Sequence, residues 1–140
     1  MISITLAKQL RGAGLGWTPV WGDVFHIPER NLDDRVFVIA DLSVDVTTLV
    51  DGIGAITFNG AVEWSLDYIL TQDVVWLPSE TQLRDGLGPA FGGLRTTDTG
   101  FRCDVHTDDG PLGFEAPTAE DAYGLALLHS LDPRPHTGLT

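Results

Sequence analysis

Cysteine is almost absent from this sequence, and its single copy, Cys103, excludes a disulfide within the chain. Cys103 lies between Phe101 and Val105 in an alternating apolar and polar segment, which predicts a small buried hydrophobic side chain rather than a reactive thiol. The chain also lacks an apolar run long enough to span a bilayer, and it lacks a basic segment followed by an apolar one at its start. We therefore expect a cytoplasmic protein without a membrane partner.

Cations are scarce as well. Eight lysine and arginine residues, of which Lys8 is the one lysine, stand against 20 acidic residues and give a formal net charge of −12. Because binding to a nucleic-acid backbone requires clustered cations, we expect no nucleic-acid partner. Solubility or a compositional bias explains the acidity; an alternative is a negative surface that imitates nucleic acid and occupies a basic protein.

Several catalytic motifs are missing too. The sequence contains neither GxxxxGK[ST] nor GxSxG, which excludes a P-loop nucleotide site and the usual serine-hydrolase elbow. The four histidines, at positions 26, 106, 129 and 136, show no HxxxH spacing. We therefore expect no cofactor, and a binding module rather than an enzyme.

Two catalytic alternatives stay open. One is a small metal-assisted hydrolase, in which carboxylates and an imidazole hold one ion. Its candidate ligands are His26, Asp33, Asp34 and Asp41. The other is acid–base catalysis by carboxylates that meet across neighbouring strands. Its candidates are Glu63, Asp67, Asp104 and Glu115. The spacing of the first set matches no common ligand rule, and solvation explains the second set more simply.

The last part of the chain has the clearest structural pattern. Apolar and polar residues alternate over 101–106 and resume at Leu112 and Phe114, with turn residues at 97–100 and 107–111. This pattern predicts an antiparallel meander that begins with a strand ending near Thr96. Thr118 then caps a helix that runs to Leu131 and is apolar nearly all round. Such a helix must be covered by the sheet on one side and by a further element or a second subunit on the other.

The earlier part of the chain predicts shorter elements. They are a helix at 4–11 capped by Ser3, strands at 24–27 and 35–40, a strand or extended segment at 41–51, a hairpin about Asn59–Gly60, a short strand or packed loop at 74–77, and a helix opened by a Ser79–Gln82 capping box. The run at 35–40 predicts a central strand buried on both faces. A helix over 61–70 competes with the hairpin. The fold prediction is one α+β domain over residues 1–131, with a mainly antiparallel, curved sheet, a long C-terminal helix packed on it and two short helices, followed by a flexible tail at 132–140.

Aromatic residues exceed what a small meander needs. Aromatic side chains are the usual anchors of ligand and partner sites, although core packing also uses them. The candidate binding residues are Trp17, Trp21, Trp64, Trp76 and Tyr68. They predict a binding or adaptor module whose partner is another protein or a second copy of the chain.

Four segments of the sequence resemble a set of short actinobacterial proteins. The segments are residues 17–38 (WTPVWGDVFHIPERNLDDRVFV), 58–67 (FNGAVEWSLD), 76–84 (WLPSETQLR) and 114–128. Some of these proteins carry a pilus-assembly (CpaE-like) label shared with pilus-localisation ATPases. The glycine-rich phosphate loop and its lysine, which such an ATPase needs, are missing from this chain. The resemblance therefore implies a single cytoplasmic bacterial domain without assigning a mechanism.

Overall fold

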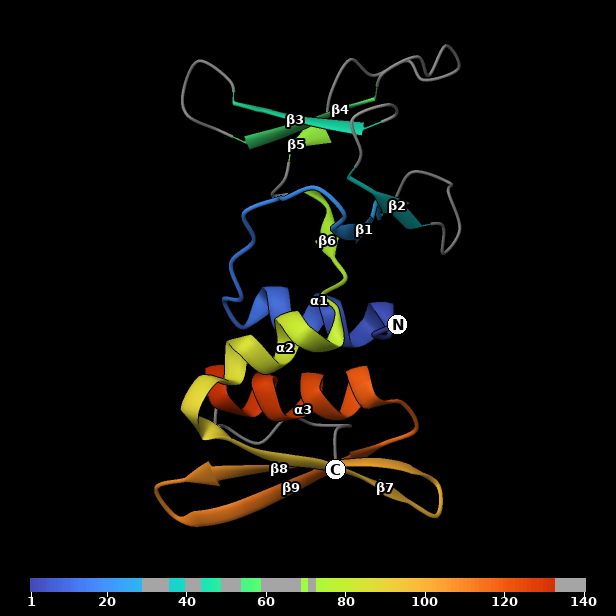
Figure 1. Cartoon of the computed structure of the whole chain (residues 1–140). Coiled ribbons are helices and arrows are strands. Elements are labelled where there is room, and N and C mark those ends of the chain that lie inside the picture. Colours follow the sequence, from blue (N-terminus) through green and yellow to red (C-terminus); the bar gives the residue numbers. More distant parts are fainter. Residues whose placement is uncertain (29–35, 40–43, 49–53, 59–68, 71–72, 133–140) are drawn as a thin grey trace. The chain divides into compact units, whose positions relative to one another are not determined.

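The computed structural model describes residues 1–28, 36–39, 44–48, 54–58, 69–70 and 73–132 (Figure 1). The chain divides into two compact units: unit 1 is Met1–Leu15 with Pro78–Thr140, and unit 2 is Gly16–Leu77. Helices and antiparallel three-stranded sheets together confirm the predicted α+β class. The single domain over 1–131 stays a prediction, and residues 133–140 of the predicted tail lie outside the described residues.

The sheet of unit 1 is the predicted meander. Its strands are β7 (Phe91–Thr97), β8 (Gly100–Thr107) and β9 (Gly110–Ala116), in the order β7-β8-β9. Cys103 pairs with Leu94 on one side and with Phe114 on the other, so these three side chains share a face. Gly110 takes a φ of 109° where β8 turns into β9, a conformation that glycine adopts without steric cost.

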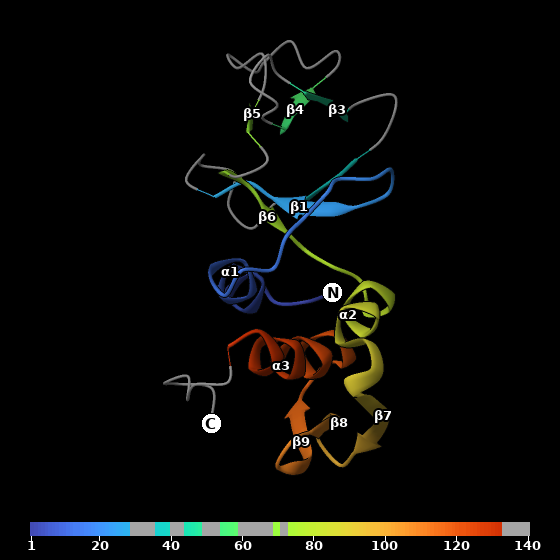
Figure 2. The ribbon, with the colours of Figure 1, turned by 90° about the vertical axis from the view of Figure 1, so that its left-hand side faces the viewer.

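Helix α3 (Ala119–Leu131) is covered on two sides, as the sequence predicts. The Thr118 hydroxyl accepts a hydrogen bond from the Asp121 N–H at 3.2 Å and caps the helix. One side of α3 packs on β8 and β9, and the other packs on α1 (Ile4–Gly12) and α2 (Glu80–Leu87) (Figure 2). The second covering layer therefore comes from this chain.

Both short helices begin where the sequence predicts. Ser3 accepts a hydrogen bond from the Leu6 N–H at the start of α1. At α2, Ser79 and Gln82 form the predicted capping box, in which each side chain accepts a bond from the other residue's backbone N–H. A 3₁₀ turn, η2 (Gly88–Ala90), then leads into β7.

Unit 2 contains two more antiparallel sheets. The first consists of β1 (Val24–His26), β2 (Val36–Val38) and β6 (Val75–Trp76), in the order β2-β1-β6. The second consists of β3 (Val44–Thr48), β4 (Gly54–Phe58) and β5 (Ile69–Leu70), in the order β3-β4-β5. Strand β1 confirms the strand predicted at 24–27, and β3 agrees with the prediction for 41–51 over residues 44–48, which the structure describes. Strand β6 selects the strand over the packed loop at 74–77.

The prediction of a buried central strand at 35–40 is wrong. Among the described strands β2 is bonded to β1 alone, and its Val36 and Val38 side chains are 38% and 46% exposed. The inner position belongs to β1, whose Phe25 is fully buried. A continuous apolar run is typical of a covered strand, but a run this short does not specify which strand stands beside it. The hairpin about Asn59–Gly60 and the competing helix fall on residues 59–68, outside the described part of the chain, and only Ile69–Leu70 of that region is described, as β5.

Candidate binding site

Four aromatic side chains gather on one face of the sheet formed by β2, β1 and β6. Phe25 pairs with Phe37 in β2 and with Trp76 in β6, so all three side chains lie on the same face. The Phe25 and Phe37 ring centroids are 5.6 Å apart. Trp17 adds a fourth ring, 6.2 Å from Trp76 with nearly parallel planes and 6.0 Å from Phe25. We call these four residues the aromatic cluster.

The segment after Trp17 forms a tight turn, Val20–Asp23, which we call the Trp21 turn. The Asp23 N–H donates to the Val20 carbonyl at 3.1 Å, and Gly22 between them takes a φ of 92°. Two further backbone bonds, Gly22 N–H to Ile39 O and Ile39 N–H to Asp23 O, both 2.8 Å, attach the turn to the residue after β2. Both ends of the turn are therefore held.

Asp23 is buried under the turn, with only 5% of its surface exposed. One oxygen of its carboxylate, Oδ2, accepts hydrogen bonds from the Trp17 indole N–H at 2.9 Å and from the Val20 backbone N–H at 3.0 Å. A buried carboxylate is stable only when hydrogen bonds or charges replace its hydration. The two donors supply part of that replacement, and they join the aromatic cluster to the Trp21 turn.

Trp21 itself points into solvent, with 70% of its surface exposed, and the neighbouring Val20 is 54% exposed. Of the five predicted binding residues, the structure therefore places Trp17 and Trp76 together in the aromatic cluster and Trp21 on the turn beside it. Trp64 and Tyr68 lie outside the described residues. No sequence motif marks Asp23 as the residue that connects the aromatic cluster with the turn.

The Trp76 indole N–H is a buried donor without a hydrogen-bond partner in the described structure. Such a donor carries a free-energy cost of about 1–3 kcal/mol.

Of the four predicted metal ligands, His26 is the one that lies among the described residues. His26 lies on β1 opposite Val36 and Val75 and is only 7% exposed. Asp33, Asp34 and Asp41 lie outside the described residues. Within the part of the chain that the structure describes, no three histidine, cysteine or acidic side chains are arranged to hold a metal ion.

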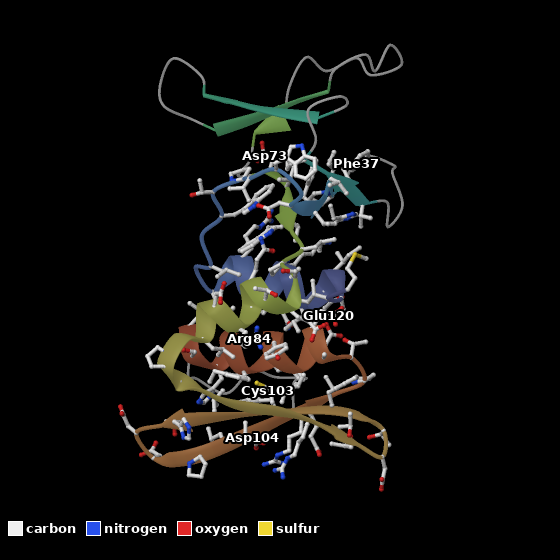
Figure 3. All side chains as sticks on the ribbon, in the orientation of Figure 1. Phe37, Asp73, Arg84, Cys103, Asp104 and Glu120 are labelled. Carbon is white, nitrogen blue, oxygen red and sulfur yellow. The ribbon has the colours of Figure 1, made fainter. Side chains whose placement is uncertain are left out.

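Cys103 and Asp104 stand on opposite faces of β8 (Figure 3). Cys103 is fully buried towards α3, as the sequence predicts, and burial raises the pKa of its thiol to about 11. A thiol with so high a pKa holds almost no thiolate at neutral pH, so it is a poor nucleophile.

Asp104 is held by two arginines rather than by a second acid. The Arg102 Nε–H donates to its carboxylate at 2.8 Å, and Arg95 lies 3.2 Å away. These contacts, the Arg102 hydrogen bond first, lower the pKa of the Asp104 carboxyl, which makes it an unsuitable general acid. Glu115 stands opposite Arg102, while Glu63 and Asp67 lie outside the described residues.

The structure brings together two histidines that the sequence leaves apart. His106 at the end of β8 and His129 near the end of α3 line one cavity of unit 1. No sequence motif links the two histidines, because their closeness in space depends on how α3 lies against the sheet. The alternating pattern of β8 and the nearly all-round apolar pattern of α3 predict both elements, but they do not predict which ends of the elements lie close together.

Comparisons with protein-family models, with curated proteins and with solved structures found no match to this chain. Among the described residues, no helix combines the length and the apolar character needed to cross a lipid bilayer.

Proposed function

We propose that this chain is a non-catalytic binding module that holds another protein, or a second copy of itself, through the Trp21 turn. The observation that carries the proposal is the 70% exposure of Trp21 on a turn whose two ends are fastened by hydrogen bonds. Its setting would be the bacterial cytoplasm, with neither nucleic acid nor membrane as partner, in line with the acidic composition and the sequence resemblance.

The physical support begins with the cost of exposing tryptophan. Full burial of a large apolar side chain stabilises a protein by about 1.5–3 kcal/mol, and Trp21 forgoes most of that gain in the free chain. Tryptophan is also the residue type most enriched among interface anchors. An exposed tryptophan therefore fits a surface that is completed by a partner.

The rigidity of the Trp21 turn also supports the proposed binding role. Asp23 fixes Val20 and the Trp17 indole, and Gly22 is bonded to Ile39, so the backbone around Trp21 has little freedom to lose on binding. Ordering a flexible loop costs affinity, whereas a preformed loop avoids that cost. Ile39, to which the turn is bonded, directly follows Val38, a second exposed apolar residue.

The test is site-specific photocrosslinking. A photoreactive phenylalanine derivative replaces Trp21 in one version of the protein and Leu112 in the control, because Leu112 is also exposed, at 40%, but belongs to unit 1. We expect a discrete crosslinked protein from position 21, identifiable by mass spectrometry, and none from position 112.

The identified partner, or the chain itself if the crosslink is to a second copy, is then titrated against Trp21→Ala. Loss of an interface anchor should weaken binding by about 2 kcal/mol or more, roughly thirtyfold, with an unchanged circular dichroism spectrum. Leu112→Ala should bind normally. Equal crosslinking from both positions, or normal binding by Trp21→Ala, would refute the proposal.

A further inference from the structure

Unit 1 contains a cavity of about 290 Å³. The residues that line it belong neither to the aromatic cluster nor to the Trp21 turn, which are both in unit 2. The cavity lies where β8 ends, bordered by the ends of α2 and α3. Its floor is apolar: Leu87, Val105 and Ala126 line it and are each at least 96% buried. The volume is at the lower end of the range for small-molecule pockets in proteins, about 300–1,000 Å³.

The rim of the cavity is polar and accessible. His106, Asp108 and Ser130 line it and are exposed, and His129 is half-buried. The His129 ring packs against Phe114 with centroids 5.4 Å apart, which fixes its position on the rim. An apolar floor with a few placed polar groups is the usual composition of a ligand site.

The charge of the rim favours a cation. Among the described residues that line the cavity, Asp108 carries a formal charge and none is lysine or arginine. Leu87 is the last residue of α2, and His129 and Ser130 belong to the last turn of α3. The carboxyl end of a helix carries a partial negative charge of about half an electron, so two such ends add to the negative potential.

We propose that this cavity binds a small organic cation, a primary amine carried on a compact apolar body. The ammonium group would lie at Asp108, with the Ser130 hydroxyl and the imidazole nitrogens of His106 and His129 beside it, while the apolar body would cover Leu87, Val105 and Ala126. An anion of the same size would meet Asp108 and two helix carboxyl ends without a compensating lysine or arginine. A metal ion is disfavoured, because no group of three suitable ligands occurs among the described residues.

The experiment compares matched probes on the whole chain by amide NMR. Phenethylamine is the amine, and 3-phenylpropionate is an anion of similar size and shape. We expect millimolar phenethylamine to shift the backbone amides of residues 106–108 and 129–130 in a saturable way, and 3-phenylpropionate to leave them unchanged.

Two neighbouring aspartates provide the variant and its control. Asp108→Asn removes the charge that faces the cavity, and we expect it to weaken phenethylamine binding about threefold to fivefold, the size of an exposed ion pair. Asp109→Asn removes the same charge from the next residue of the turn, which does not line the cavity, and it should bind as the unchanged protein does.

Three outcomes would overturn the proposal: no saturable shift with the amine, an equal response to 3-phenylpropionate, or equal effects of the two substitutions. Both aspartates are exposed, so loss of folding does not confuse the comparison. Because the cavity is lined by unit 1 alone, the result is independent of the outcome at the Trp21 turn in unit 2.

Discussion

Asp23 is the single residue on which the geometry of the Trp21 turn depends most. Replacing it with alanine leaves the Trp17 indole N–H and the Val20 N–H without their acceptor. Both hydrogen bonds are partly buried and end on a carboxylate, and a hydrogen bond to a charged group contributes about 1.5–3 kcal/mol, so we expect Asp23→Ala to lower the free energy of unfolding by about that amount. Urea unfolding followed by tryptophan fluorescence measures it.

The control for Asp23 is Asp73→Ala, which removes an exposed carboxylate from the same unit. A surface substitution of this kind should change the free energy of unfolding by no more than about 0.5 kcal/mol. Similar losses from both variants would mean that the Asp23 hydrogen bonds contribute nothing specific.

Asp104 allows a prediction about pH. Its carboxyl pKa is lowered chiefly by the Arg102 hydrogen bond, with a smaller contribution from Arg95. A lowered pKa in the folded state stabilises the protein above the unfolded value, about 3.9 for aspartate, and that contribution is lost as pH falls through the folded value. Arg102→Met should therefore raise the Asp104 pKa towards its ordinary value and weaken the acid dependence of stability.

Carbon-detected NMR of the Asp104 carboxyl group follows this titration directly. Arg95→Met is the matched comparison, since it removes the second arginine and leaves the 2.8 Å hydrogen bond intact. It should raise the pKa less than Arg102→Met does. A larger rise from Arg95→Met would show that the hydrogen bond is not the dominant cause.

Single residues were predictable where a local pattern determines them. The burial of Cys103 follows from alternation along one strand, and the caps at Ser3, Ser79 and Thr118 follow from local hydrogen-bonding chemistry. The role of Asp23 does not follow from such a pattern, although its partners Trp17 and Val20 are close in the sequence, because no motif marks the bend that brings both donors to one carboxylate. The placement of His106 and His129 around one cavity depends on contacts that the fold makes between separate segments.

At the scale of elements, the hydrophobic pattern predicts how many sides of a helix or strand are covered. It predicts less well which neighbouring element covers each side. A helix apolar on all sides needs two layers, and α3 has the sheet on one side and α1 with α2 on the other. The same reasoning failed for β2, where apolar side chains stay exposed at the end of a sheet. Four or five apolar residues suffice to make a strand, but the order of strands depends on the whole sheet.

The packing of α1 on α3 depends on a glycine. A Cβ atom added at Gly124 would lie 2.6 Å from Leu6 Cδ2 and 3.2 Å from Ile2 Cδ1, and both of those side chains are buried. Overpacking of this kind costs about 1–3 kcal/mol, while alanine gains about 1 kcal/mol of helix propensity over glycine. We expect Gly124→Ala to lower the free energy of unfolding by about 1 kcal/mol, measured by urea denaturation with circular dichroism.

Gly12→Ala makes the same substitution at the last residue of α1, where a Cβ would meet nothing within 4 Å. It should leave stability unchanged or raise it by up to about 1 kcal/mol. If Gly124→Ala were as stable as Gly12→Ala, close contact between α1 and α3 would not be the reason for glycine at position 124.

For the whole molecule, the positions of the tryptophans and of the helices allow the two units to be observed separately. All four tryptophans lie within Gly16–Leu77, so fluorescence reports on unit 2. Helices α1, α2 and α3 all belong to unit 1, so circular dichroism at 222 nm reports mainly on that unit. Two probes can therefore test whether the predicted single domain over 1–131 unfolds as one.

We expect the two signals to change at different denaturant concentrations. Each unit has buried side chains of its own, such as Phe25 and Ile27 in unit 2 and Leu83 and Leu128 in unit 1, and coincident transitions are the mark of one cooperative domain. Gly124→Ala sharpens the test, because it should move the circular dichroism midpoint and leave the fluorescence midpoint in place. Midpoints that coincide in the unchanged protein, and that shift together in Gly124→Ala, would establish the single domain that the sequence predicts.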